Sequence, residues 1–286
     1  MESIRKVGIV SKPNIPSAAD IVSGLLHWLS ERGIEYRCDE QTASYAGISK
    51  SYVREDVPDD TQLLIVLGGD GTLLSAARSV DGKDIPLFAV NLGGLGFLTA
   101  ITVDQLYPEL ERSLRGEHRI GLRRMIDCEL IRGGETLASY SALNDVVITK
   151  TMIARIIDLD TYVDDHFVAS FKADGLIIST PTGSTAYSLS AGGPIIFPSV
   201  GCICLTPICP HMLTNRPVIV SDSSVIRIDS RSEDGTFLTI DGQVGEPISK
   251  GDRIVCRSSS KTIKLVRPPK MMFFDVLREK LKWGER

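Results

Sequence analysis

The strongest constraint on the fold is the way short, wholly apolar runs alternate with segments of helical periodicity in the first hundred residues. Residues 63–67 are apolar throughout and end at the glycine pair Gly68-Gly69. Residues 72–80 then have helical spacing, and residues 86–91 return to a strand-like run. A strand with no polar alternation is buried on both faces, as in parallel sheets covered by helices. The pattern therefore predicts an α/β domain over residues 1–100, built on a parallel sheet wound with helices.

From about residue 119 the apolar pattern changes to the period of two that is typical of half-buried strands. Ile126, Cys128 and Leu130 lie at every second position, a Gly133-Gly134 turn follows, and residues 137–150 continue in an extended pattern. A glycine-rich turn between two extended runs predicts a β-hairpin at this place.

A second hairpin is predicted where an Asp-Gly pair separates two β-rich runs. Asp234-Gly235 lies between residues 225–228 and residues 237–240, and Asp-Gly is a common hairpin turn. We therefore expect a β-rich, sandwich-like domain over residues 101–267. Residues 268–286 open with prolines and then have helical spacing, which predicts a C-terminal helix that packs back on the N-terminal domain.

Composition and charge exclude several classes of protein. The 32 Lys and Arg residues against 36 Asp and Glu residues leave a net charge of −4, which argues against a broad nucleic-acid or anionic-membrane surface. No apolar run approaches the roughly 18 residues that a membrane-spanning helix needs, and residues 1–6 lead into a strand-like run rather than a signal peptide. We therefore expect a cytoplasmic protein with no nucleic-acid or membrane partner, whose six cysteines are reduced thiols.

The sharpest local signal is Gly68–Thr72, with the sequence Gly-Gly-Asp-Gly-Thr, at the expected end of a buried strand and start of a helix. In open α/β sheets, ligands bind beyond the carboxyl ends of the strands. Glycines there allow close backbone approach, and the N–H groups of a helix start suit phosphate. Asp70 is the carboxylate of this loop, and it could orient or deprotonate an attacking hydroxyl. A plain Gly-Asp-Gly turn is the alternative interpretation.

A second glycine cluster, residues 91–97, follows the next strand and is expected beside the first loop at the same edge of the sheet. It lacks the G-x-G-x-x-G spacing of dinucleotide-binding folds, and the chain has no G-x-x-x-x-G-K-[ST] loop. These two common nucleotide-binding motifs are therefore excluded. Phe97 either belongs to the core or flanks an aromatic ring of a ligand.

Polar residues gather in two further places. Thr180, Thr182, Ser184 and Thr185 crowd a Pro/Gly loop behind an apolar strand, and such a density of hydroxyls suits a polar, hydroxyl-rich ligand. A Ser/Thr-rich cap and turn would explain only one or two of them. Asn144-Asp145 interrupts an otherwise apolar run, so at least one of these two side chains is expected to point into a pocket or a buried hydrogen-bond network.

Taken together, these motifs resemble those of the NAD kinase family of the bacterial type, and the resemblance runs through most of the chain. Gly68–Thr72 alone is shared with the wider kinase superfamily, so the combination is what makes the resemblance specific. Residues 91–98 resemble the second glycine-rich loop of that family, residues 142–145 its Asn-Glu/Asp motif, residues 174–194 its long signature, and residues 241–243 its late glycine turn.

The resemblance implies transfer of the γ-phosphoryl group of ATP to the 2′-hydroxyl of the adenosine ribose of NAD, which gives NADP. It also implies a divalent metal, Mg²⁺ by preference, bound with the ATP phosphates, with no metal-ligating side chain expected. Asp70 is then the proton acceptor, and phosphoryl transfer needs positioning and charge neutralisation more than a strong base. Family members have an N-terminal α/β domain and a C-terminal β domain with the active site between them, and they assemble as homodimers or homotetramers.

By the same resemblance, a set of residues in both domains is expected to bind NAD or the nucleotide. Arg155 and Lys172 match basic positions near the phosphates, and a solvated strand face is their alternative interpretation. Lys172 stands where close relatives carry Arg, and it lacks the bidentate fork of an Arg. The full set is Asp70, Gly71, Asn144, Asp145, Arg155, Lys172, Asp174, Thr185, Ala186, Tyr187, Ser188, Leu189, Ser190 and Gln243.

Three other interpretations stay open. Cys202, Cys204, Cys209 and His211 could be read as metal ligands, although their spacing fits no common structural zinc motif and buried thiols explain them equally well. Another kinase of the same superfamily, with a lipid or sugar acceptor, would share the first glycine loop. A non-catalytic dinucleotide sensor would keep the fold, but an intact Asp70 argues against it.

Overall fold

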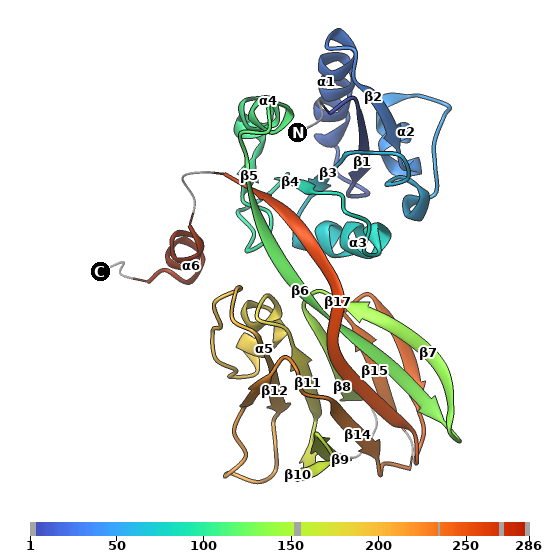
Figure 1. Ribbon diagram of the computed structural model, residues 1–286, viewed down its shortest axis with the longest axis vertical. Coiled ribbons are helices and arrows are strands. Elements are labelled where there is room, and N and C mark those ends of the chain that lie inside the picture. Colours follow the sequence, from blue (N-terminus) through green and yellow to red (C-terminus); the bar gives the residue numbers. More distant parts are fainter. Residues whose placement is uncertain (1–3, 152–155, 234, 269–271, 284–286) are drawn as a thin grey trace. The chain divides into compact units, whose positions relative to one another are not determined.

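The computed structural model describes residues 4–151, 156–233, 235–268 and 272–283. The chain divides into two compact units, the first made of residues 1–122 and 263–286 and the second of residues 123–262. The first unit extends beyond residue 100 because α4 (Leu106–Leu114) packs in the core of the parallel sheet. The chain passes between the units within two long strands, β6 (Arg119–Arg132) and β17 (Arg253–Arg267) (Figure 1).

A parallel sheet forms the centre of the first unit. β1 pairs with β2 on one side and with β3 on the other, and β4 extends the sheet beyond β3. Every residue of β3 is buried, as its unbroken apolar run predicts. β5 and the C-terminal end of β17 also pair with β4 in parallel. The strands are β1 (Lys6–Ser11), β2 (Glu35–Cys38), β3 (Leu63–Gly68), β4 (Leu87–Asn91) and β5 (Ile101–Thr102).

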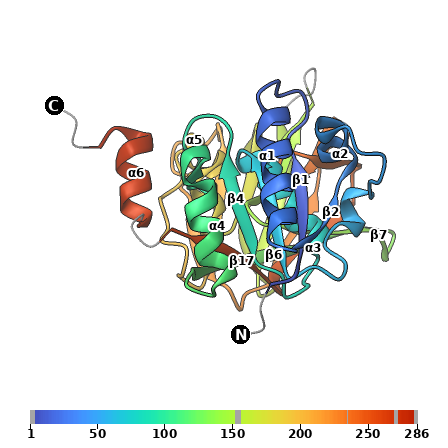
Figure 2. The same ribbon diagram turned by 90° about the horizontal axis from the view of Figure 1, so that it is seen from above.

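Helices cover both faces of this sheet. α1 and α4 lie on one face and α3 lies on the other (Figure 1; Figure 2). α1 buries Val22, Leu25 and Leu29 against the sheet, and α3 confirms the helix predicted over residues 72–80. Among the described residues, no helix has the length and apolar character that crossing a membrane requires. Besides α4, the helical segments of this unit are α1 (Ala18–Glu31), α2 (Glu40–Ala46), α3 (Asp70–Val80), α6 (Phe273–Leu281) and the 3₁₀ turns η1 (Arg54–Asp56) and η2 (Val103–Gln105).

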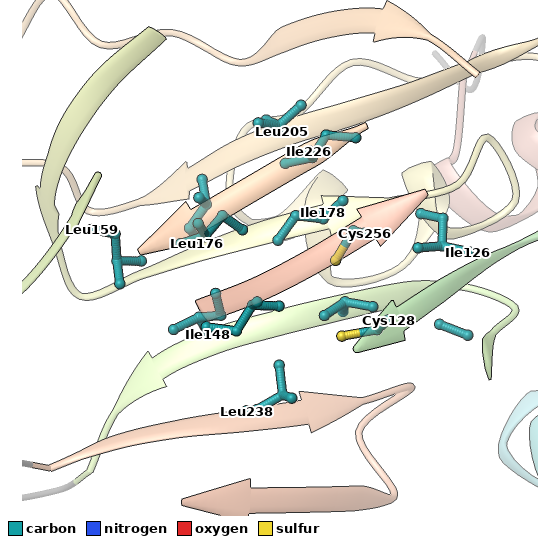
Figure 3. Packing of buried hydrophobic residues seen from close by; sticks show 14 of the residues in the cluster. Ile126, Cys128, Ile148, Leu159, Leu176, Ile178, Leu205, Ile226, Leu238 and Cys256 are labelled. Carbon is teal, nitrogen blue, oxygen red and sulfur yellow. The ribbon is translucent and has the colours of Figure 1, made fainter. Parts of the chain in front are cut away.

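The second unit is a sandwich of two sheets, as its period-two pattern predicts. One sheet has the order β13–β12–β11–β8–β15–β16, and the other contains β10–β9–β14–β17 with β6 and β7 beyond β17. Figure 3 shows how their apolar side chains meet: Ile148, Leu176 and Leu238 come from the first sheet, and Cys128 and Ile226 from the second. The elements are β7 (Glu135–Ala142), β8 (Asp145–Lys150), β9 (Ile157–Val163), β10 (His166–Ala173), β11 (Gly175–Ser179), η3 (Gly183–Thr185), α5 (Tyr187–Ser190), β12 (Cys202–Ile208), β13 (Val218–Ser221), β14 (Ile226–Ser230), β15 (Thr236–Ile240) and β16 (Val244–Ile248).

The first predicted hairpin is confirmed, but its second arm is shorter than the pattern indicates. β6 and β7 pair in antiparallel register on either side of Gly133 and Gly134, and both glycines have a positive φ. The extended segment 137–150 is two strands in different sheets, because β7 pairs with β6 whereas β8 pairs with β11 and β15. Leu143 and Asn144 carry the chain from one sheet to the other.

The second predicted hairpin is wrong. β14 pairs with β9 and β17, whereas β15 pairs with β8 and β16 in the opposite sheet. Ile226 and Ile228 of β14 and Leu238 and Ile240 of β15 are all buried in the core between the sheets. Two runs that alternate with the same period fit either a hairpin or a crossing between sheets, so an Asp-Gly signal alone does not decide between them.

Candidate functional site

The two predicted glycine loops lie side by side in the first unit, where they line a cavity of about 290 Å³. β3 and β4 are neighbours in the sheet and Gly68 pairs with Asn91, so both loops leave the same edge, as the sequence predicts. We call this cavity the glycine-loop pocket. Its lining residues are Lys12, Ile15, Gly68, Gly69, Asp70, Asn91, Leu92, Gly93, Gly94, Leu95, Gly96 and Lys280.

Asp70 is the first residue of α3, and its carboxylate fastens the second glycine loop. Oδ2 accepts a hydrogen bond from the N–H of Phe97 at 2.9 Å, and Oδ1 accepts bonds from the N–H groups of Leu98 and Thr99, both at 3.1 Å. The Thr99 hydroxyl also donates to Oδ1, at 2.9 Å. A Cβ atom at Gly96 would meet this carboxylate, so the loop can approach only as glycine. Asp70 therefore organises the pocket, which a plain turn residue does not do.

Asn91, the last residue of β4, holds the beginning of the same loop. Its Nδ2 donates to the Thr99 hydroxyl at 2.7 Å, and its Oδ1 accepts a hydrogen bond from the N–H of Gly93 at 2.8 Å. Thr99 is thus bonded to both Asn91 and Asp70, a role that no motif in the sequence indicates. The loop is tied at both ends, so its glycine backbone presents a defined surface to the pocket.

Two lysines that the motifs did not indicate line the same pocket. Lys12 directly follows β1, so the available signal was its position at the carboxyl edge of the sheet. Lys280 comes from α6, and its Nζ lies 5.8 Å from the centroid of the Phe97 ring, within cation–π range. The charged residues lining the pocket are therefore two lysines and Asp70. This positive balance, together with the start of α3 and the glycine backbone, suits a phosphate group.

The donor set of the glycine-loop pocket fits a metal that is bound with phosphates. In the part of the chain that the structure describes, no group of three or more His, Cys, Asp or Glu side chains is placed to hold a metal ion. Mg²⁺ does not require such a group, because it usually binds through one or two carboxylates together with substrate phosphates and water. Asp70 is the carboxylate that lines this pocket.

A second polar cavity, of about 480 Å³, lies in the second unit at the point where the chain passes from β7 to β8. It brings together Asn144 and Asp145 with part of the 185–190 stretch and with the late glycine turn, as the resemblance implied. We call it the Asp145 pocket. Its lining residues are Asn144, Asp145, Val147, Thr149, Ala186, Tyr187, Thr239, Asp241 and Gly242.

Asp241 fixes the backbone on one side of this pocket. Its carboxylate accepts hydrogen bonds from the N–H groups of Leu143, Asn144 and Asp145, at 3.0, 2.8 and 3.1 Å. Its own N–H donates to the Asp145 carbonyl at 2.9 Å. On the other side, a Cβ atom at Gly183 would meet the Asn144 backbone. Residues 143–145 are therefore held between two segments that are distant in sequence.

Two polar side chains of the Asp145 pocket are in unusual environments. The Oδ1 atom of Asn144 is buried and has no hydrogen-bond partner among the described residues, which is uncommon for a buried polar atom. Burial and, to a smaller extent, the charge of Asp241 raise the pKa of Asp145 to about 7. Near neutral pH, a carboxyl group with this pKa both donates and accepts hydrogen bonds. Both residues line a cavity, as the sequence predicts for at least one of them.

The aromatic ring of Tyr187 supplies the pocket with an apolar surface. Tyr187 is 44% exposed although it lines the cavity, so its ring is open to a ligand. Ala186 lies beside it, at the start of α5. Among the described residues that line this cavity, the other members of the predicted 185–190 stretch do not appear. Ser188 is buried and its hydroxyl is 2.9 Å from that of Thr206.

The hydroxyl-rich loop has a different role from the one its composition suggests. Thr180 is buried, and its hydroxyl donates to the Leu143 carbonyl at 2.7 Å and accepts from the Gly183 N–H at 3.0 Å. The hydroxyl of Ser184 is also buried and bonds to backbone groups of its own loop and of Ile196. The expectation that these hydroxyls face a ligand is therefore wrong for Thr180 and Ser184, because they replace missing backbone hydrogen bonds in a tight, buried turn.

The remaining predicted site residues are not among those that line the two cavities, or they lie outside the described chain. Lys172 is on β10, where its Nζ lies 3.7 Å from Asp158, and its side chain is 64% exposed. Asp174 forms an ion pair of 2.6 Å with Lys150. Gln243 directly follows the Gly242 turn of the Asp145 pocket. The predicted residue Arg155 lies outside the described residues.

The cysteine cluster considered as a metal site is not assembled in the described part of the chain. Cys202 and Cys204 are buried strand residues, whereas Cys209 is exposed. Burial raises the pKa of both Cys202 and Cys204, which disfavours the thiolate form that a metal needs. Cys202 and Cys204 are therefore explained as buried free thiols, and Cys209 is an exposed free thiol.

The fold and the two cavities define a nucleotide-binding protein with a phosphate-type pocket in an α/β unit and a polar, aromatic-lined pocket in a β-sandwich unit. Comparison with known families agrees with this class. Residues 7–118 match the model of the ATP-NAD kinase N-terminal domain, and residues 143–268 match that of the ATP-NAD kinase C-terminal domain.

Full-length relatives point to the same family. The chain is 64% identical over 287 residues to an NAD kinase of Solibacter usitatus and 48% identical over 288 residues to one of Koribacter versatilis, with 99–100% of each chain covered. The crystal structure of yeast NADH kinase complexed with NADH superposes with a TM-score of 0.93 at 28% identity, over 100% of this chain and 89% of that one. The structure of an NAD kinase from Archaeoglobus fulgidus in complex with ATP shares the fold, with a TM-score of 0.78 at 23% identity, over 97% of this chain and 98% of that one. The chain belongs to the ATP-NAD kinase family.

Proposed function

We propose that this chain is an NAD kinase, which transfers the γ-phosphoryl group of ATP to the 2′-hydroxyl of the adenosine ribose of NAD and so forms NADP. The observation that carries the proposal is Asp70, a carboxylate held by four hydrogen bonds in a cavity whose other charged lining residues are Lys12 and Lys280. The full-length relatives named NAD kinase support it.

In this proposal the glycine-loop pocket takes the phosphates of ATP. The glycines of both loops let the backbone approach the phosphate oxygens, and the start of α3 adds a favourable dipole. Lys12 and Lys280 offset part of the triphosphate charge. A divalent cation, Mg²⁺ by preference, would neutralise further charge on the phosphates, held by the phosphate oxygens and water.

The proposed chemistry makes modest demands on Asp70. Its carboxylate accepts a hydrogen bond from the ribose 2′-hydroxyl and takes the proton as the hydroxyl oxygen bonds to the γ-phosphorus. The bond between the γ-phosphorus and its bridging oxygen breaks, and ADP leaves. Because Phe97, Leu98 and Thr99 already fix the carboxylate, little reorganisation is needed at the moment of transfer. Positioning, rather than base strength, is what phosphoryl transfer requires.

The Asp145 pocket is suited to the adenosine part of NAD. Asn144 and Asp145 both line the pocket, and Asp145 bonds to hydroxyls as donor or acceptor. The Tyr187 ring provides a face for stacking. The charged residues that line this pocket are the acidic Asp145 and Asp241, so it repels phosphates and favours the uncharged portion of the dinucleotide. Roles for the other predicted residues, among them Lys172, Asp174, Thr185 and Gln243, remain predictions.

The direct test is NADP formation by the purified protein with NAD, ATP and Mg²⁺, measured with a dehydrogenase that accepts NADP and not NAD. We expect turnover by the wild type and a fall in kcat of about 10³-fold for Asp70→Asn, the size typical of losing a positioned general base. Calorimetry with NAD and thermal unfolding of the variant show whether it still binds and folds. Full activity in a folded Asp70→Asn would contradict the role of Asp70.

Failure of the wild type itself would redirect the proposal. NAD binding without turnover under varied metals and phosphate donors would favour a dinucleotide sensor, and turnover with a lipid or sugar instead of NAD would favour another kinase. For its assembly and location we propose a homodimer or homotetramer in the cytoplasm. All six cysteines are free, which supports a reducing compartment, and light scattering measures the assembly.

A further inference from the structure

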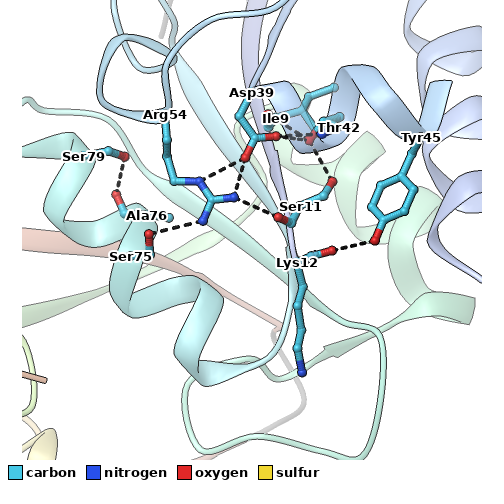
Figure 4. A network of polar contacts seen from close by, with 10 residues as sticks. All are labelled: Ile9, Ser11, Lys12, Asp39, Thr42, Tyr45, Arg54, Ser75, Ala76 and Ser79. Atoms are coloured by element: carbon cyan, nitrogen blue, oxygen red, sulfur yellow. Dashed lines mark hydrogen bonds and ion pairs between the residues drawn. The ribbon is translucent and has the colours of Figure 1, made fainter. Parts of the chain in front are cut away.

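Arg54 joins the segments that follow three strands of the parallel sheet. Its Nε donates to Oδ2 of Asp39 at 3.0 Å, its Nη2 donates to the carbonyl of Ser11 at 2.9 Å, and its Nη1 donates to the hydroxyl of Ser75 at 3.2 Å (Figure 4). Ser11 ends β1, Asp39 directly follows β2, and Ser75 lies in α3, which begins two residues after β3. One guanidinium reaches all three because the carboxyl ends of parallel strands share an edge.

The partner carboxylate of Arg54 is itself fixed. Asp39 is the N-cap of α2, and its Oδ1 accepts a hydrogen bond from the N–H of Thr42 at 2.9 Å. The Thr42 hydroxyl lies 2.5 Å from the same oxygen and 2.8 Å from the Ser11 hydroxyl. The Asp39 side chain is 4% exposed and that of Arg54 is 24% exposed, so the ion pair is largely shielded from water. In such a position the full set of directional contacts matters more than the charge alone.

Two of the segments bonded to Arg54 continue into the lining of the glycine-loop pocket. Ser11 is followed by Lys12, whose side chain extends away from the Arg54 contacts in Figure 4 and lines the pocket. Ser75 is in the same short helix as Asp70, which is the first residue of α3. Arg54 therefore connects the backbone next to Lys12 with the helix that carries Asp70, although it does not line the pocket itself.

We propose that Arg54 is a positioning residue for phosphoryl transfer, which holds Lys12 and Asp70 at a fixed separation by bonding to Ser11 and Ser75. This inference rests on the proposed function, because it assumes that the reaction is phosphoryl transfer from ATP to NAD. The bonds of Asp70 tie the first residue of α3 to the second glycine loop, whereas apolar packing of the rest of the helix against the sheet is not directional. The hydrogen bond from Arg54 to Ser75 fixes a second point on the helix, and small displacements of reacting groups lower rates strongly.

A matched pair of serine variants on α3 tests the proposal. Ser75→Ala removes the contact with Arg54 and leaves the ion pair to Asp39 intact. Ser79→Ala is the control, because the Ser79 hydroxyl bonds only to the helix's own Ala76 carbonyl, at 2.8 Å, as far as the described residues show. We expect kcat to fall about fivefold in Ser75→Ala and to stay within about twofold of wild type in Ser79→Ala, as for one hydrogen bond lost. KM for NAD should be unchanged in both.

Arg54→Lys provides a second, stronger test that retains the charge. A lysine can pair with Asp39 but cannot also reach Ser11 and Ser75, so we expect kcat to fall about tenfold. The double variant with Ser75→Ala should be no slower than Arg54→Lys alone, because the same contact is already lost. Equal kcat in Ser75→Ala and Ser79→Ala would overturn the proposal, as would losses that multiply in the double variant.

A binding measurement separates this proposal from the proposed function. If the wild type does not form NADP, the kinase assignment fails, and calorimetry with inorganic triphosphate still reports on the pocket. We expect triphosphate affinity to fall about threefold in Ser75→Ala and not in Ser79→Ala, since a displaced wall weakens the Lys12 contact. If both variants bind triphosphate as the wild type does, the positioning role of Arg54 is refuted whatever the reaction.

Discussion

The glycine-loop pocket and the Asp145 pocket share one hydrogen-bonding arrangement but differ in charge. In each, an aspartate accepts three backbone N–H hydrogen bonds from a segment distant in sequence: Asp70 from residues 97–99 and Asp241 from residues 143–145. Two lysines line the first pocket, whereas acidic residues are the charged lining of the second. The shared bonds indicate that the aspartate fixes the shape of each loop. Under the proposed function, the neighbouring charges would determine which part of a nucleotide each pocket accepts.

The largest expected effect is on the free energy of unfolding, when Asp241→Asn weakens the hydrogen bonds that hold residues 143–145 in the Asp145 pocket. The amide oxygen can still accept hydrogen bonds, but the NH₂ group would face backbone donors. Because bonds to a charged acceptor are worth about 1.5–3 kcal/mol each, we expect a loss of about 4 kcal/mol in the free energy of unfolding, measured with urea. NAD binding, measured by calorimetry, should be lost as residues 143–145 move.

Asp165→Asn is the matched control for this change. Asp165 belongs to the same unit as Asp241, and both residues have a positive φ. The Asp165 side chain is 90% exposed, so its substitution should alter the free energy of unfolding by less than about 0.5 kcal/mol. A similarly small effect of Asp241→Asn would show that its three hydrogen bonds do not hold the pocket together.

A smaller effect is expected from the charge environment of Asp145. Its pKa is raised from 3.8 to about 7, first by burial and then by Asp241, so the folded protein keeps the proton over a range in which the unfolded chain loses it. The stabilisation is therefore complete below about pH 4 and is lost as the pH rises through 7. From pH 4 to pH 7, we expect the unfolding free energy of the wild type to fall relative to Asp145→Asn by about 3 kcal/mol. Parallel pH profiles in urea titrations would contradict a raised pKa.

Local features of both pockets could be predicted from the sequence, because each depends on a short stretch of chain. The apolar run before Gly68–Thr72 marks a buried strand, and the glycines mark a loop that lines a pocket. Asn144-Asp145 stands out in the same way, as polar residues within an apolar run. In both cases a departure from the local pattern coincides with a pocket residue, as expected where function overrides folding preferences.

Contacts between distant segments could not be predicted in this way. Asp241 lies about a hundred positions after the backbone that it holds, and Lys280 reaches the glycine-loop pocket from a terminal helix. The pairing of β14 and β15 with different sheets likewise depends on long-range partners. At Ser184 a local feature gave a wrong prediction. Its polarity suggested contact with a ligand, but its hydroxyl bonds to buried backbone groups of Pro181 and Ile196.

The division of the substrate between the two pockets is tested most directly by measuring KM for ATP and for NAD in Lys12→Met and Asn144→Ala, with Lys83→Met as a lysine control outside the pocket. We expect Lys12→Met to raise KM for ATP about tenfold and leave KM for NAD unchanged, since a charge-assisted contact to phosphate is lost. Asn144→Ala should raise KM for NAD and leave KM for ATP unchanged. Lys83→Met should change neither KM. If Lys12→Met and Asn144→Ala change the same KM, the two pockets do not divide the nucleotides as proposed.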